Sequence, residues 1–320
     1  YLNLMQMIQA GENASKGAKQ LTEAVTPFAH YIKEFEPAIT FQDNTPSTTK
    51  EYRQYLDEMS KNSYKLNEAS YKLSLASEIM TKVDTTVFPK SIQSEILDIK
   101  DYVKQIDDVA KAYKEASSFL PAVLGQDERQ RYLILLQNES EMRATGGWPT
   151  SYGVLGIEGG QIREIFVDDI YNADGTLKVQ GKTYNPPDSM AKALNLTKWS
   201  FSLANWYPDL SDTHDSLEKF TKDLGIGSRI DGVITIDIAF LQKLLDKWGG
   251  IQVPGEDEII TSQNIYPKIF EMHEEFEPGS TQKASFLANL ANEVIKKIFS
   301  MNISDAISLK DVFISSLNEK

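Results

Sequence analysis

The chain has 320 residues, of which 41% are hydrophobic and 25% are charged, as is typical of a globular protein with room for two domains. Its formal net charge is −13 and no run of Lys or Arg occurs, which argues against nucleic acid as a partner. The sequence has no cysteine, so disulfides, cysteine nucleophiles and cysteine-bound metals are excluded.

Residues 1–125 are predicted to be helical. Apolar residues recur along 50–83 at largely helical steps, which is the spacing of a buried helix face. Breaks are expected at 35–47 and at Phe88-Pro89. The pattern predicts an antiparallel helical bundle, because isolated helices must bury their apolar side. The clearest apolar stripe, expected in the core rather than on a docking face, comprises Ile96, Ile99, Val103, Ile106, Val109 and Tyr113.

From Arg131 onward, glycine becomes frequent and strand patterns replace helical ones. Tyr132–Leu136 is a continuous apolar run, typical of a strand covered on both faces. Gly159-Gly160 separates two further strand patterns, 152–157 and 162–167, and therefore indicates a hairpin.

The remainder of the chain alternates between strand and helix patterns. The alternation predicts a layered α/β domain, and the hairpin makes its sheet mixed. The overall expectation is a helical bundle over residues 1–125, followed by an α/β domain over 126–320. The expected elements are a turn-rich loop at 168–188 around Asp174-Gly175, a helix from Ser211 or Asp212 to Gly225, a strand at 230–236, a helix at 238–248, a short strand at 251–253 and a helix at about 282–299.

The polar turn after the first strand is the best candidate for a binding site, because α/β folds place ligands at the carboxyl ends of strands. Arg143 could clamp an anion such as phosphate, or form a local ion pair with Glu139 or Glu141. We expect these three residues to lie within one side-chain length of Asp209. The predicted ligand-binding residues are Arg143, Glu141, Thr145, Gly146, Gly147, Asn205, Trp206 and Asp209.

Aspartates in the second half of the chain could bind Mg²⁺ if the strand ends bring them together. Asp169 and Asp209 are the candidate metal ligands, and the alternative is that these aspartates are cap and turn residues. The 3 histidines stand far apart without paired spacing, so a histidine metal site is not expected.

Several motifs, in order, resemble a bacterial family known only as domain of unknown function 4012. They are RYLILLQN from Arg131, ExRxTGG from Glu141, SYG from Ser151, NWxPD from Asn205 and DGVITID from Asp231. Alanine 144 stands where the family usually has proline, and tryptophan 148 where it usually has phenylalanine. Members are typically envelope proteins with an N-terminal membrane segment and a helical region. The resemblance therefore implies an extracytoplasmic protein, anchored by a membrane segment before residue 1, with the bundle as a stalk or collar.

A more distant similarity is to the LytR–CpsA–Psr phosphotransferases, which move glycopolymers from a polyprenyl-pyrophosphate lipid to peptidoglycan. The similar part runs from Leu224 to Val253 and closes with WGGIxV from Trp248. It implies a LytR–CpsA–Psr-like fold, an arginine set and an aspartate-bound Mg²⁺. However, no arginine follows Arg229, although that family has a late arginine-rich motif.

Two functions are therefore compatible with the sequence. The first is a non-catalytic surface or interaction module of the cell envelope, which the missing late arginines favour. The second is Mg²⁺-dependent transfer or binding of a polyprenyl-pyrophosphate-linked glycan. The expected partners are an envelope glycan, a lipid-linked glycan or other envelope proteins, with no nucleic acid.

Overall fold

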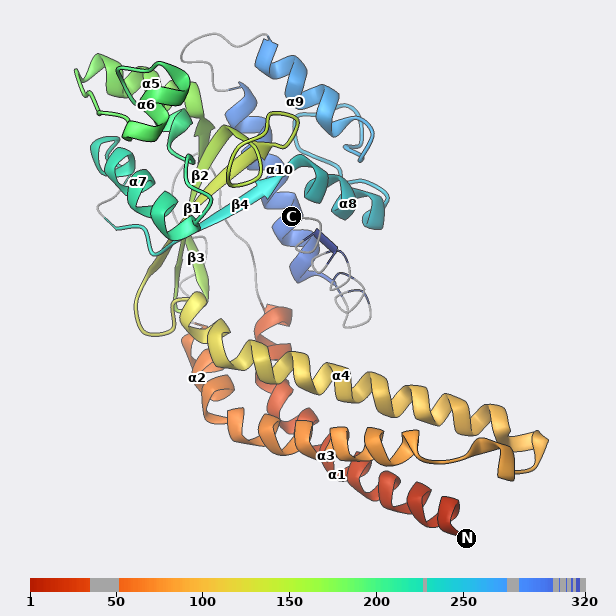
Figure 1. Ribbon diagram of the computed structural model, residues 1–320. Coiled ribbons are helices and arrows are strands. Elements are labelled where there is room, and N and C mark those ends of the chain that lie inside the picture. Colours follow the sequence, from red (N-terminus) through yellow and green to blue (C-terminus); the bar gives the residue numbers. More distant parts are fainter. Residues whose placement is uncertain are drawn as a thin grey trace. The chain divides into compact units, whose positions relative to one another are not determined.

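The computed structural model describes residues 1–34, 52–226, 229–274 and 282–301, and residues 305, 309, 312, 315 and 316. The break predicted at 35–47 lies outside the described residues. The chain forms two compact units, drawn in Figure 1. Among the described residues, no helix is both long enough and apolar enough to cross a membrane. The first unit contains Tyr1–Phe35, Lys50–Glu128 and Gly159–Gln161, and the second contains Arg129–Glu158 and Ile162–Lys320.

The first unit is helical, as the sequence predicted. Its helices are α1 Leu2–Glu34, α2 Arg53–Lys61, α3 Ser63–Thr81 and α4 Gln93–Val123, with 3-10 turns η1 Thr85–Val87 and η2 Lys90–Ile92. The early part of α1 shares a core with the late part of α3, and the late part of α1 shares a second core with the early part of α3. These helices are therefore antiparallel, and α3 also packs along α4 (Figure 1).

Small residues let α1 and α3 approach each other closely. Ala10, Gly17 and Ala24 are buried and recur every seven residues along α1. A Cβ atom on Gly17 would lie 2.7 Å from the Cγ of Leu73, so a larger side chain at this position would force the helices apart.

The apolar stripe predicted along α4 is only partly correct. Ile96 and Val103 are buried, whereas Ile99 is 45% exposed. The buried face of α4 runs through Ile96, Val103 and Ala110, at steps of seven residues, and this face leaves Ile99 on its flank.

The second unit has a mixed sheet, as predicted. Its described strands are β1 Gln130–Asn138, β2 Trp148–Glu158, β3 Gln161–Asp169 and β4 Gly232–Asp237, in the order β3-β2-β1-β4. The strand β1 pairs antiparallel with β2 and parallel with β4. The hairpin predicted at Gly159-Gly160 joins β2 to β3, so this expectation is confirmed.

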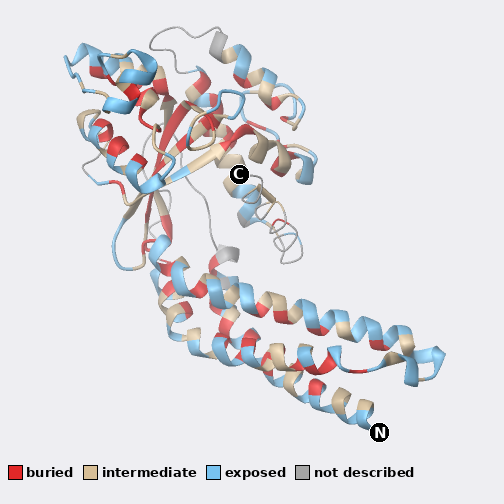
Figure 2. Ribbon diagram, in the orientation of Figure 1, coloured by how far each residue is buried: buried red, intermediate tan, exposed pale blue. Residues whose placement is uncertain are grey.

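Helices cover both faces of this sheet. They are α5 Ile170–Val179, α6 Asp188–Leu194, η3 Phe201–Leu203 and α7 Leu210–Asp223, then α8 Ile238–Trp248, α9 Ile265–Glu274 and α10 Gln282–Phe299. Leu133 and Leu135 share a core with α5, α6 and α7, whereas Leu136 packs with α8, α9 and α10. Successive side chains of β1 thus enter opposite layers, and Figure 2 shows buried residues along the central strands.

Several predicted elements need correction. The loop expected at 168–188 contains α5, because the Asp169 side chain caps a helix that buries Ile170 and Leu177. The helix expected to begin at Ser211 or Asp212 is capped by Asp209 instead. The segment 251–253 forms only an isolated bridge. The helices α6 and α9 were not predicted, whereas α8 and α10 have the predicted bounds.

Candidate functional site

The polar residues at the carboxyl end of β1 and in the loop that follows are linked by hydrogen bonds, which also include Asn205. Gln137 is 1% exposed, and its Nε2 donates to Thr145 Oγ1 at 2.6 Å. The Nδ2 of Asn205 donates to the same hydroxyl at 3.0 Å and to the Gly147 carbonyl at 2.9 Å. These bonds fix the β1–β2 loop, residues 139–147, to the segment before α7. The structure therefore brings together three of the predicted site residues.

The two adjacent glycines of this loop serve its own packing. Gly146 has a φ of 112°, a left-handed conformation that glycine adopts without strain. A Cβ atom on Gly147 would lie 2.6 Å from the Asn138 carbonyl oxygen and 2.9 Å from the Glu139 nitrogen. The loop can therefore cross the end of β1 only with glycine at position 147.

Arg143 is held by stacking on an aromatic ring. Its guanidinium carbon lies 4.3 Å from the centroid of the Trp148 ring, which is cation–π geometry. Its Nη1 donates to the Met142 carbonyl at 2.7 Å. Met142 itself is 87% exposed. The loop thus presents an arginine and a methionine at its surface.

The local ion pair expected for Arg143 is not found within the part of the chain that the structure describes. The Glu139 carboxylate instead accepts a hydrogen bond from the Ile238 nitrogen, at 3.3 Å. Glu141 is exposed on the loop. The predicted approach of these residues to Asp209 is likewise not seen as a hydrogen bond or ion pair among described residues.

Asp169 is committed to a buried ion pair. Its Oδ2 lies 2.9 Å from Lys283 Nζ, and the two side chains are only 1% and 4% exposed. Lys283 also donates to the Thr150 carbonyl at 3.1 Å. This lysine, at the start of α10, was missed by sequence reasoning, because a lone lysine on an amphipathic helix normally faces solvent.

Both candidate metal ligands, Asp169 and Asp209, cap helices, as the alternative interpretation predicted. Asp169 accepts a hydrogen bond from the Tyr171 nitrogen at 2.9 Å, and Asp209 accepts one from the Ser211 nitrogen at 2.7 Å. The described residues contain no group of three or more His, Cys, Asp or Glu side chains placed to hold a metal. Mg²⁺ at this pair therefore has no support from the geometry.

Trp206 and Asp168, which lie close in the sequence to the two candidate metal ligands, also have local hydrogen-bond partners. The Trp206 Nε1 donates to Ser189 Oγ at 3.1 Å, which ties the predicted aromatic residue to α6. Burial raises the pKa of Asp168, although the hydrogen bond from Asn172 opposes the shift.

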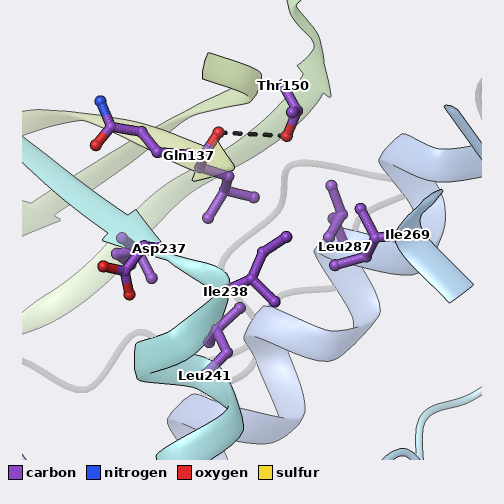
Figure 3. Close-up of a pocket in the computed structure, with 9 residues that line it drawn as sticks. Gln137, Thr150, Asp237, Ile238, Leu241, Ile269 and Leu287 are labelled. Carbon is purple, nitrogen blue, oxygen red and sulfur yellow. Dashed lines mark hydrogen bonds between the residues drawn. The ribbon is translucent and has the colours of Figure 1, made fainter. Parts of the chain in front are cut away.

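A small cavity lies between β1, β4, α8, α9 and α10 (Figure 3). Its volume is about 10 Å³, which is space for one water molecule. Ile238, Leu241, Ile269 and Leu287 gather on one side of it, whereas the Gln137 amide points away from them (Figure 3). The cavity is therefore a packing gap of the apolar core and is too small for an organic ligand.

Comparison with known proteins supports one of the two resemblances. Residues 127–272 match the model of a family described as "Protein of unknown function (DUF4012)". This match supports the family predicted from the motifs in this part of the chain. No curated protein and no solved structure matches the chain. The similarity to the LytR–CpsA–Psr phosphotransferases therefore stays a prediction.

Proposed function

We propose that this protein is a non-catalytic binding module of the bacterial cell envelope. The premise is the match of residues 127–272 to a family of unknown function. The proposed contact is the β1–β2 loop, and the proposed partner is an envelope glycan. The envelope location rests on the family resemblance of the sequence motifs.

The observation that carries this proposal is a loop that is rigid at its base and exposed at its tip. Thr145 and Gly147 are fixed by Gln137 and Asn205, as described above. Met142, on the same loop, is 87% exposed. A preorganised loop loses little conformational entropy on binding, so its exposed side chains can contribute more of their contact energy to affinity.

The side chains on this loop suit a sugar surface. Arginine and methionine are enriched at recognition surfaces, and a guanidinium offers several donors in one plane. The stacking of Arg143 on Trp148 holds that plane in place. Sugar hydroxyls can accept hydrogen bonds from such donors, while the exposed methionine contacts the apolar C–H face of the sugar.

A non-catalytic function is supported by the role of Asp169. The predicted phosphotransferase reaction needs carboxylates that hold Mg²⁺ against the charge of a pyrophosphate. The Lys283 ammonium at 2.9 Å already compensates the Asp169 carboxylate in a buried ion pair. A metal at this position would have to displace Lys283 and leave its ammonium buried without a partner.

Co-sedimentation of the protein with purified cell-wall glycan tests the proposal. We expect the double substitution Met142→Ser/Arg143→Ala to weaken binding by about tenfold, the loss of roughly one good contact. Val179→Ser is the control, because Val179 is 89% exposed and lies at the last position of α5, outside the β1–β2 loop. Equal binding by native protein, double variant and control would overturn the assignment of this loop.

Incubation with a polyprenyl pyrophosphate and Mg²⁺ tests the non-catalytic part separately. We expect no release of phosphate product by the native protein above the level of a blank without protein. Release that depends on both the protein and Mg²⁺ would show that the domain is an enzyme.

A further inference from the structure

The opposite end of β1 carries a second polar set, which the sequence did not single out. An open pocket of about 410 Å³ is lined there by Arg129, Arg131, Arg163 and Glu164. Arg131 stands seven residues before Asn138, so roughly 24 Å of strand separates this pocket from the β1–β2 loop. It is therefore a different surface from the one assigned above.

One carboxylate in this pocket accepts hydrogen bonds from two arginines. Glu164 Oε2 accepts hydrogen bonds from Arg129 Nη2 at 2.6 Å and from Arg131 Nε at 2.9 Å. Its other oxygen, Oε1, accepts from Arg131 Nη2 at 2.8 Å. Arg131 also donates to the Ile226 carbonyl. The guanidinium of Arg131 is thus held in a fixed plane, with Arg129 beside it.

A glycine in the intervening strand allows this arrangement. The sheet order β3-β2-β1 puts β2 between Arg131 on β1 and Glu164 on β3. Gly156, which is paired with Arg131, lies on β2 between them. A Cβ atom there would lie 2.9 Å from Arg129 Nη2 and 2.9 Å from Glu164 Cβ. Without a side chain at position 156, the arginines can reach across β2 to the carboxylate.

The charges of the pocket do not balance. Three arginines and one glutamate line it, which leaves an excess of two positive charges among the lining residues. The Arg163 side chain makes no ion pair or hydrogen bond with any described residue, and its Nε is buried without a partner. This excess stands out in a chain whose formal net charge is −13.

The carboxylate that bonds to the Arg131 backbone is already engaged. Asp231 Oδ2 accepts a hydrogen bond from the backbone nitrogen of Arg131 at 2.8 Å. Its Oδ1 pairs with the guanidinium of Arg229. Asp231 therefore offsets the charge of Arg229 rather than that of a pocket arginine.

We propose that the pocket lined by Arg129, Arg131 and Arg163 binds a phosphate dianion, either free or as a phosphomonoester. The planar donors of arginine match the oxygens of a phosphate, and two positive charges match the charge of the dianion. The pocket opens to solvent, so a phosphate carried on a soluble sugar or on a lipid headgroup can enter. This proposal goes beyond the proposed function and does not depend on the β1–β2 loop.

Calorimetric titration of the full chain with inorganic phosphate at low ionic strength tests the proposal. We expect saturable binding that weakens as salt is added, because screening reduces the attraction between the charges. The substitutions Arg129→Gln and Arg163→Gln should each weaken binding by about tenfold, as expected for the loss of one charge-assisted contact. Glu164→Gln should strengthen it, since the amide no longer competes with phosphate for Arg129 and Arg131.

Arg53→Gln is the matched control, because it removes the same charge from an exposed arginine at the start of α2. Circular dichroism would show that each variant is folded before titration. Two further probes, glucose 1-phosphate and phosphatidylcholine vesicles containing phosphatidic acid, separate a soluble source of the phosphate from a lipid one. Absence of binding to all three probes, or equal binding by native protein and the Arg129→Gln and Arg163→Gln variants, would overturn the site.

Discussion

The two ends of β1 show how differently a cluster of polar side chains can be used. At the carboxyl end, Gln137, Thr145 and Asn205 bond to one another, and Asp169 is paired with Lys283. At the amino end, one carboxylate serves two arginines and a third arginine lines the same pocket. The carboxyl end is the more crowded with polar groups, whereas the pocket at the amino end is lined by more arginines than carboxylates. The balance between partners, rather than the number of polar residues, therefore distinguishes a site that can bind an ion from one that holds the fold together.

The largest effect should come from breaking the buried ion pair at the carboxyl end. Lys283→Met leaves the Asp169 carboxylate buried without its partner, so the free energy of unfolding should fall by about 3–5 kcal/mol. Chemical denaturation measures this change.

Lys296→Met on the same helix is the matched control for this substitution. Lys296 is also paired with a carboxylate, but its side chain is 45% exposed. Its loss should cost less than about 1 kcal/mol, because exposed ion pairs are screened by water. Similar losses for the two variants would mean that the buried ion pair of Lys283 is not structurally essential. Asp169 could then pair with another group at the carboxyl end of β1.

A substitution at Gly147 tests whether the base of the β1–β2 loop is rigid. Gly147→Ala places a Cβ atom against backbone atoms of β1, which cannot move independently of the sheet. We expect a loss of about 2–3 kcal/mol in the free energy of unfolding. Gly175→Ala is the control, since nothing lies within 4 Å of a Cβ atom there. Gly175 is inside α5, so alanine should stabilise the protein by up to about 1 kcal/mol. A neutral Gly147→Ala would contradict the rigid loop.

The outline of the fold could be predicted because it depends on local patterns. The bounds of α8 were correct, since Asp237 caps its start and Gly249, at a φ of 71°, ends it. The hairpin turn at Gly159-Gly160 could be predicted because paired glycines readily adopt the positive φ that such a turn requires, and both have positive φ in the structure. In contrast, α5 was read as a loop, because Asp174-Gly175 looks like a turn. There the Asp174 carboxylate instead accepts hydrogen bonds from Phe201 and Ser202, a contact that only tertiary packing creates.

The candidate site could be located only in part, because its chemistry depends on distant partners. The motif around Thr145 and Asn205 was recognised, and the two residues do meet. The ion pair of Asp169 was not recognised, since its partner Lys283 is 114 residues away. The arginine pocket was missed for the same reason. Its residues lie on β1, just before β1 and on β3, and only the strand order and the missing side chain of Gly156 bring them together.

A substitution at Gly156 compares the two ends of β1 directly. A Cβ atom there meets the Arg129 guanidinium and the Glu164 side chain, rather than backbone. Side chains can move aside, so Gly156→Ala should cost only about 1 kcal/mol in the free energy of unfolding. Chemical denaturation beside Gly147→Ala gives the comparison. Equal losses would mean that the arginine pocket is as rigid as the β1–β2 loop, which would remove the contrast between the two ends.

The smallest effect should be a pH dependence on the amino-terminal side of β4. His214 on α7 has its Nε2 2.8 Å from the Ile230 carbonyl, just before β4. This hydrogen bond, and Asp215 nearby, raise the pKa of His214 above its ordinary value near 6.5. Because the folded pKa is raised, protonated His214 stabilises the folded protein fully below the unfolded pKa, and this contribution disappears as the pH rises through the folded pKa. His214→Gln is neutral at every pH and can still donate to the carbonyl. The difference in free energy of unfolding between native protein and variant should therefore be larger at about pH 5.5, below the ordinary histidine pKa, than at about pH 8.5. A difference that stays constant between these pH values would show that folding does not raise the pKa of His214.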